Sequence, residues 1–196
     1  MTAGTSIGVF GGSFDPIHNG HIRAAQSVFD ALELDRLIFV PAGNQWQKSS
    51  ETPASSRLKM VELAIQDHPQ FEVSSIDVDR TGPTYSVDTL TELGRDNPGA
   101  KLFFILGTDA LAGIETWKSA DEVLNLAQFV VVSRPGTLLQ IPEMARGRVW
   151  ELEIPALDLS STEFREKYAT GGHFSDLVPA SVLLYIKENQ LYKDSK

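Results

Sequence analysis

Cysteine is absent from this sequence of 196 residues. Without cysteine, disulfides, thiolate metal sites and cysteine nucleophiles are all excluded. The glycine-rich patterns GxGxxG and GxxxxGK[ST], which bind dinucleotides and triphosphates, are absent as well. An NAD-dependent oxidoreductase and a P-loop ATPase therefore have no support from motifs.

Basic residues and long apolar runs are also scarce. Seventeen Lys and Arg against 26 Asp and Glu give a formal net charge of −9, which argues against nonspecific nucleic-acid binding. No run approaches the roughly 20 apolar residues that cross a bilayer, and the N-terminal residues do not resemble a signal peptide. We therefore expect a cytoplasmic protein without a membrane or nucleic-acid partner.

Short apolar runs alternate with amphipathic stretches along the chain. Runs rich in Val, Ile, Leu and Phe are typical of strands covered on both faces, and they lie at 7–10, 37–40, 102–106 and 129–132. Residues 149–154 are expected to form a final strand. Apolar residues at helical spacing, or helix-start signals, predict helices at 22–32, 57–68, 86–95, 161–169 and 179–191. The alternation predicts one α/β domain with a Rossmann-like, mostly parallel sheet and helices on both faces. A site is expected at the carboxyl ends of the strands.

Two segments interrupt this alternation. Residues 41–56 form a polar stretch with two prolines, and its length suggests a binding or lid loop rather than a simple connection. Residues 136–147 are less periodic and are expected to form a surface excursion.

The segment GGSFDPIHNGH, residues 11–21, follows the first predicted strand. Glycines allow the backbone to approach a bulky anion, and a helix N-terminus offers unpaired N–H groups to phosphate. His18 and His21 are three residues apart where a helix begins, so both imidazoles can point at one oxygen. The alternatives are two capping histidines or a metal pair. The other two histidines, His68 and His173, belong to no cluster of metal-ligating residues, which argues against a zinc site. The segment predicts a phosphate site.

A second polar segment, SSTEFR, starts a later helix. Ser160 and Glu163 have the spacing of a capping box, which is a purely structural role. Arg165 lies four residues after Ser161 and so shares its helical face. Hydroxyls, free N–H groups and a guanidinium converge there, a combination that suits a polyphosphate.

Together the two segments resemble the nucleotidyltransferase superfamily marked by HxGH and SSTxxR, and within it the bacterial nicotinate-nucleotide adenylyltransferases. GGSFDPIHNGH is similar to the family's GG[T/S]FDPIHxGH, and SSTEFR to its SSTxIR. Residues 83–90 resemble its TYTxxTL segment, and Gly107-Thr108-Asp109 with Trp117-Lys118 resembles its G[ST]D…W[KR] segment. The resemblance covers nearly the whole chain. It implies one nucleotidyltransferase domain, 1–196, whose C-terminal helical part, about 160–192, completes an ATP site.

The resemblance implies adenylyl transfer from ATP to nicotinate mononucleotide in NAD biosynthesis, with release of pyrophosphate. His18, His21 and Arg165 would be catalytic. ATP would bind residues of both motifs and of the strand end between them: Gly11, Gly12, Ser13, Phe14, His18, His21, Gly107, Asp109, Ser161, Thr162 and Arg165. Nicotinate mononucleotide would bind Ser13, Lys48, Thr84, Tyr85 and Trp117. Mg²⁺ is expected through the ATP phosphates rather than through dedicated protein ligands.

Other interpretations remain open at this point. Asp109 has an alternative role as a helix cap, Trp117 as a core residue, and Arg134 faces either phosphate or solvent. A nicotinamide mononucleotide or phosphopantetheine adenylyltransferase, or a non-catalytic nucleotide sensor, would share the terminal motifs. The oligomeric state is undetermined, and a homo-oligomer is compatible with the sequence.

The loop after Pro41 departs from the family pattern. Two prolines that relatives carry before a basic residue are missing, although Lys48 stands at the basic position. Asn44 is displaced by one residue from the family's asparagine, and Trp46 is either a lid or a packing residue.

Overall fold

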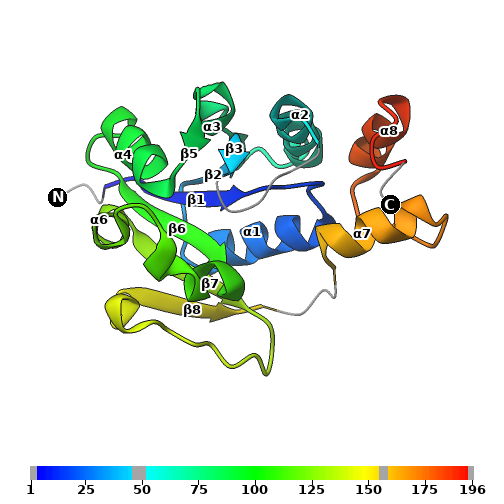
Figure 1. Cartoon of the computed structure of the whole chain (residues 1–196). Helices are drawn as coiled ribbons and strands as arrows, with labels where there is room; N and C mark the ends of the chain where they lie inside the picture. The colour runs from blue at the N-terminus through cyan, green and yellow to red at the C-terminus, as the bar shows by residue number, and fades with distance from the viewer. Residues whose placement is uncertain (1–3, 46–51, 155–158, 194–196) are drawn as a thin grey trace.

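Six parallel strands form the central sheet of the computed structural model, which describes residues 4–45, 52–154 and 159–193 (Figure 1). The strands lie in the order β4-β2-β1-β6-β7-β8, and each neighbouring pair is parallel. Their bounds are β1 (Ser6–Gly12), β2 (Arg36–Pro41), β4 (Phe71–Val73), β6 (Lys101–Gly107), β7 (Gln128–Ser133) and β8 (Val149–Glu153). The predicted parallel α/β sheet is therefore confirmed.

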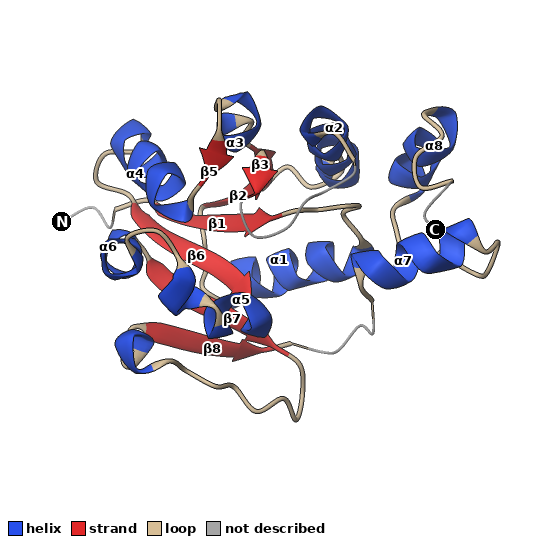
Figure 2. Ribbon diagram, in the orientation of Figure 1, coloured by secondary structure: helices blue, strands red, loops and turns tan. Residues whose placement is uncertain are grey.

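Helices cover both faces of this sheet (Figure 2). Successive strand residues point to opposite faces, and Phe39 and Val40 accordingly join different hydrophobic clusters. One cluster includes side chains of α1 (Asn19–Ala31), α2 (Ala54–Ile65), α7 (Ser161–Ala169) and α8 (Ala180–Glu188). The other includes side chains of α4 (Ser86–Asp96), α5 (Thr108–Ala112) and α6 (Ala120–Leu126). Burial on both faces explains why the strands read as continuous apolar runs.

Short elements complete the structure. The two-residue strands β3 (Asn44–Gln45) and β5 (Pro83–Thr84) pair in parallel, beside α3 (Ile76–Asp79). Single 3₁₀ turns lie at Ile114–Thr116 and Glu143–Ala145. None of these elements, nor β4, was predicted, because two to four residues are too few to show a periodicity. No helix within the described ranges is both long and apolar enough to cross a membrane.

Two boundaries differ from the sequence-based expectation in ways that matter for the site. Strand β1 continues through Gly11 and Gly12, so these glycines end the strand rather than form the turn. Helix α2 begins at Ala54, directly after Pro53, and its buried residues include Arg57, whereas Leu58 is only half-buried. Val61, Ala64 and Ile65 are buried, as the helical spacing predicts, and the charged Arg57 is buried with them.

The turn between β1 and α1 starts where the strand order divides. β1 has β2 on one side and β6 on the other, so the chain leaves the sheet at its topological switch point. Phe14 in this turn has a φ of +49°, a left-handed conformation that costs about 1–2 kcal/mol for a non-glycine residue. Its ring is 1% exposed and packs edge-on against Phe10 and Phe39, which offsets that cost.

Candidate active site

His18 and His21 cap helix α1 reciprocally. The His21 N–H donates to Nδ1 of His18 at 3.3 Å, and the His18 N–H donates to Nδ1 of His21 at 3.2 Å. The two rings stack with centroids 3.6 Å apart. A Cβ on Gly20 would lie 2.9 Å from Nδ1 of His18, so the stacked arrangement requires the glycine between them. The capping alternative is therefore correct, and it also fixes how the rings are presented.

The capping bonds determine the tautomer of each neutral imidazole. Because each Nδ1 accepts a backbone N–H, each neutral ring carries its proton on Nε2. Burial, and to a lesser extent the nearby Arg134 cation, lowers the pKa of His18 from 6.5 to about 4. Burial, with His18 beside it, also lowers the pKa of His21 well below 6.5. At neutral pH both rings are therefore uncharged Nε2–H donors.

Helix α7 holds the other side of the same turn. The Ser161 hydroxyl donates to the Pro16 carbonyl at 2.9 Å, and Nη1 of Arg165 donates to the Asp15 carbonyl at 2.6 Å. Nη2 of Arg165 reaches Oγ1 of Thr162 at 3.2 Å. This motif thus binds the histidine turn and fixes it against α7.

Only half of the predicted capping box at α7 is present. Oγ of Ser160 accepts the Glu163 N–H at 3.0 Å, as expected. The Glu163 carboxylate instead pairs with Lys167 one turn later, at 2.7 Å. An i,i+4 ion pair competes with the reciprocal bond here, a possibility that spacing alone does not reveal.

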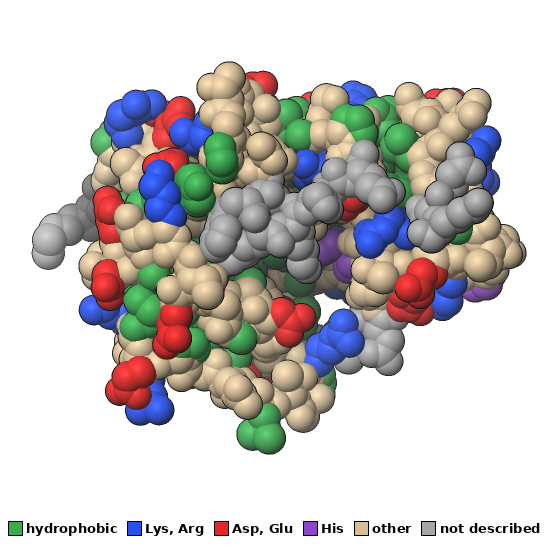
Figure 3. Space-filling view, in the orientation of Figure 1, with side chains coloured by type: hydrophobic (Ala, Val, Ile, Leu, Met, Phe, Trp, Pro, Cys, Tyr) green, Lys and Arg blue, Asp and Glu red, His purple; other side chains and the backbone are tan. Residues whose placement is uncertain are grey.

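A cavity of about 760 Å³ lies between this turn, α7 and the ends of β6 and β7. All eleven residues predicted to bind ATP line it, and so does Arg134, which therefore faces this cavity. In the space-filling view, histidine side chains lie in a hollow with basic side chains near its rim (Figure 3). Asp109 lines the cavity and is exposed. It does not cap α5, whose N-cap is Gly107, so the capping alternative for Asp109 is wrong.

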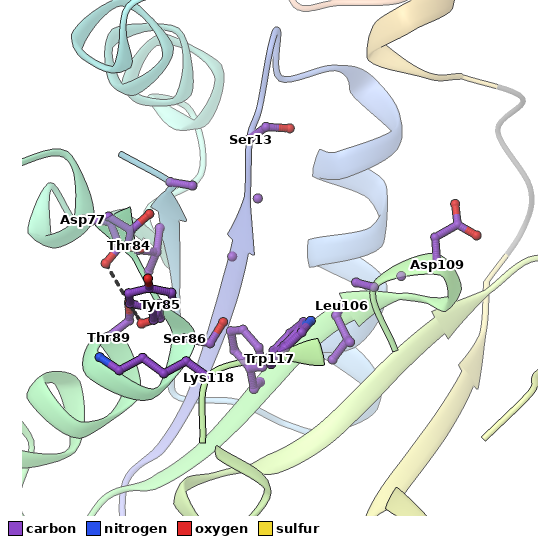
Figure 4. A pocket seen from close by; sticks show the side chains of 17 residues that line it. Ser13, Asp77, Thr84, Tyr85, Ser86, Thr89, Leu106, Asp109, Trp117 and Lys118 are labelled. Atoms are coloured by element: carbon purple, nitrogen blue, oxygen red, sulfur yellow. Dashed lines mark hydrogen bonds between the residues drawn. The ribbon is translucent and has the colours of Figure 1, made fainter. Parts of the chain in front are cut away.

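A second cavity, of about 510 Å³, opens on the other side of Ser13 (Figure 4). Of the residues predicted to bind nicotinate mononucleotide, Ser13, Thr84, Tyr85 and Trp117 line it, whereas Lys48 and Trp46 lie outside the described residues. Asn44 lines neither cavity. The two cavities share one wall, made of Gly11, Gly12, Ser13, Leu106, Gly107 and Asp109.

The second cavity combines an aromatic surface with a helix N-terminus. Trp117 is half-buried and packs against the edge of Phe104 at 6.1 Å, so it is both a cavity wall and a core contact. Tyr85 is the N-cap of α4 and makes no side-chain capping bond, which leaves backbone donors at the start of the helix. The Thr84 hydroxyl donates to the Asn44 carbonyl at 3.2 Å and thus holds β3 against β5.

Three residues beside these cavities were given no role by the sequence-based predictions. Asp77 lines the second cavity, and its carboxylate accepts the Thr89 hydroxyl at 2.6 Å (Figure 4). Burial raises the pKa of Asp77. Lys118 lies over the Tyr85 ring at 4.5 Å and pairs with Asp88 at 3.2 Å. No motif marks Asp77. Lys118 belongs to the W[KR] pattern, but the pattern predicts no role for it.

Arg57 is the third such residue. It lies on α2 and binds Ser13 of the shared wall. Its guanidinium donates to the carbonyl of Ser13 at 2.7 Å. A charge within a helical repeat ordinarily indicates the solvent face, so periodicity could not have located it.

Comparisons with known proteins give the family. The pattern of the Cytidylyltransferase-like family matches residues 9–167. A probable nicotinate-nucleotide adenylyltransferase of Leifsonia xyli is 48% identical over 187 residues, covering 95% of this chain and 94% of that protein. One from Streptomyces coelicolor is also 48% identical and covers 93% and 98%.

Solved structures show the same fold. A nicotinic acid mononucleotide adenylyltransferase of Plasmodium falciparum, complexed with NaAD, superposes with a TM-score of 0.79 at 21% identity, over 96% of this chain and 97% of that one. A putative nicotinate-nucleotide adenylyltransferase from Vibrio parahaemolyticus gives a TM-score of 0.67 at 18% identity, over 97% of each chain. With two cavities that meet at the histidine turn and relatives of this identity and coverage, the chain belongs to the nicotinate-nucleotide adenylyltransferases.

Proposed function

We propose that this chain transfers the adenylyl group of ATP to the 5′-phosphate of nicotinate mononucleotide. The shared wall at Ser13 carries the proposal, because two ligands in adjoining cavities can meet there through their phosphates. A phosphate oxygen of the mononucleotide attacks the α-phosphorus of ATP. The bond from that phosphorus to the bridging oxygen breaks, and pyrophosphate leaves with the electron pair. No enzymic nucleophile or strong base is required.

The histidine turn would stabilise the transferred phosphate. Nε2–H of His18 and of His21 are preorganised donors toward the cavity, and such donors are worth most where charge develops in the transition state. Arg134 and Arg165 line the same cavity and supply positive charge for the departing pyrophosphate.

The second cavity would take the mononucleotide. Trp117 offers a surface on which a pyridine ring can stack, and the N-terminus of α4 offers backbone donors to the nicotinate carboxylate. This arrangement favours a nicotinate over a nicotinamide, which lacks the negative charge.

Mg²⁺ would enter with ATP. Among the described residues, no group of three or more His, Asp or Glu side chains could hold a metal ion by itself, so the donor set suits a cation held mainly by phosphates. When bound, the ion would neutralise phosphate charge. Asp109, at the shared wall, is the carboxylate placed to assist.

Pyrophosphate release from Mg-ATP with three acceptors tests the function: nicotinate mononucleotide, nicotinamide mononucleotide and phosphopantetheine. We expect release with the first and a much lower kcat/KM with the second. Release only with phosphopantetheine would overturn the acceptor. ATP binding without release for any acceptor would identify a nucleotide sensor instead.

A further inference from the structure

Arg57 is a charged side chain placed where an apolar one would be expected. It projects from α2 into the interior and is 2% exposed. Its three nitrogens each donate to a backbone carbonyl: Nη1 to Ser13 at 2.7 Å, Nη2 to Gly43 at 3.0 Å and Nε to Thr52 at 3.2 Å. Burying a guanidinium is costly even when it is hydrogen-bonded, and an apolar side chain often fills such a space with equal or better stability. Stability alone therefore does not explain Arg57.

The carbonyls that Arg57 binds belong to different walls of the site. Ser13 lies between the two cavities. Gly43 follows Ala42, which lines the mononucleotide cavity, and a Cβ on Gly43 would lie 2.0 Å from the carbonyl oxygen of Asp77, another lining residue. Arg57 thus joins the shared wall to the far wall of the mononucleotide cavity through one rigid, planar group.

These bonds also orient the turn. The Ser13 carbonyl points to Arg57, and the Asp15 carbonyl points to Arg165. These two carbonyl oxygens, which would otherwise repel a phosphate, thus accept hydrogen bonds from arginine side chains. The Ser13 hydroxyl has no hydrogen-bond partner within the part of the chain that the structure describes, and so it stays available to a ligand.

We propose that Arg57 is a positioning residue for adenylyl transfer, which sets the distance and orientation between the two bound nucleotides by holding Ser13 and Gly43 together. This inference rests on the proposed function. It predicts a defect in the chemical step rather than in binding, because each cavity keeps its own contacting residues while their relative placement changes. A misplacement of about 1 Å can slow a positioned reaction by about 10²-fold.

The test is Arg57→Lys, which keeps the charge but cannot form all three bonds. Lys59→Met is the matched control, since Lys59 lies on the same helix, is exposed and pairs only with Glu62 among described residues. Isothermal titration with nicotinate mononucleotide, and separately with a non-hydrolysable ATP analogue, counts the binding sites. We expect affinities within about threefold of wild type, and a single-turnover rate per site reduced by about 10²-fold. In Arg57→Ala, guanidinium at millimolar concentration should restore part of the rate, and sodium chloride should not.

Three results would overturn the inference. The first is a rate per site in Arg57→Lys within about threefold of wild type. The second is a loss of rate in proportion to a loss of binding sites, and the third is failure of both Arg57 variants to fold, since either would make Arg57 a folding residue only. Failure of the proposed function would look different, because wild type and Lys59→Met would then also fail to release pyrophosphate with nicotinate mononucleotide.

Discussion

His18 and His21 stack at 3.6 Å while each Nδ1 accepts the backbone N–H of the other. The two residues that cap α1 also line the first cavity. Since burial keeps both rings uncharged at neutral pH, their stacking brings no like-charge repulsion. The same contact therefore links the start of the helix to the direction in which the two rings face.

Replacing His18 by asparagine should separate its capping role from its proposed catalytic role. Asparagine is a good N-cap and can still accept the His21 N–H, so the free energy of unfolding should change little. The Nε2 donor is lost, and turnover should fall by about 10²-fold or more. His18→Ala should lose the same rate and, in addition, about 1 kcal/mol of stability. Steady-state pyrophosphate release and urea unfolding check both points. Turnover near that of wild type in folded His18→Asn would remove the catalytic role.

Acid should destabilise the protein between about pH 6.5 and pH 4. The pKa of His18 is 6.5 in the unfolded chain and about 4 in the folded one, so the unfolded chain takes up the proton first as the pH falls. Stability is thus complete above pH 6.5 and declines below it, by roughly 3 kcal/mol from His18 once the pH is below about 4. His21 acts in the same direction.

Urea unfolding of wild type and His18→Asn at several pH values measures this contribution. Carboxyl groups titrate in both proteins, so the difference between the two curves isolates the histidine. We expect the two curves to lie close together at pH 7 and to separate as the pH falls, because only wild type loses the contribution of His18. Parallel curves from pH 7 to pH 4.5 would contradict the lowered pKa of His18.

Gly20→Ala should impair catalysis without impairing the helix. Alanine has the higher helix propensity, but its Cβ would lie 2.9 Å from Nδ1 of His18 and displace the stacked ring. Turnover should fall by at least about 10-fold at nearly unchanged melting temperature. Gly94→Ala in α4 is the matched control, since its nearest neighbour would be at 3.9 Å. Equal activity in the two variants would show that the ring can move without consequence.

Replacing Trp117 should raise KM for one of the two substrates only. Loss of a stacking surface is worth about 1–3 kcal/mol, so Trp117→Ala should raise KM for nicotinate mononucleotide by roughly 10- to 100-fold. KM for ATP should stay within about threefold, because Trp117 lines only the second cavity. Trp117→Phe, which keeps an aromatic face, should lie in between. A parallel rise in both KM values would indicate that Trp117 serves the core rather than the pyridine ring.

Much of the fold could be predicted because the forces concerned are local. Continuous apolar runs marked four of the six strands of the sheet, and the edge strand β8 was also predicted. Helix α7 begins and ends where its cap and spacing placed it. Strand β4 was missed because three residues carry too little signal. Helix α2 spans Ala54–Ile65 rather than the predicted 57–68, because its N-cap is Pro53, which makes no side-chain capping bond that would mark the start in the sequence.

The sequence by itself determined which polar residues line the first cavity, because HxGH and SSTxxR place their donors within single helix starts, where spacing alone sets direction. Tertiary structure decided how these donors are held. Ser161 and Arg165 bind carbonyls 145 and 150 residues away in the chain, and Arg57 binds one 44 residues away. Such contacts exist only after the sheet has brought β1, α2 and α7 together, and no local pattern encodes them.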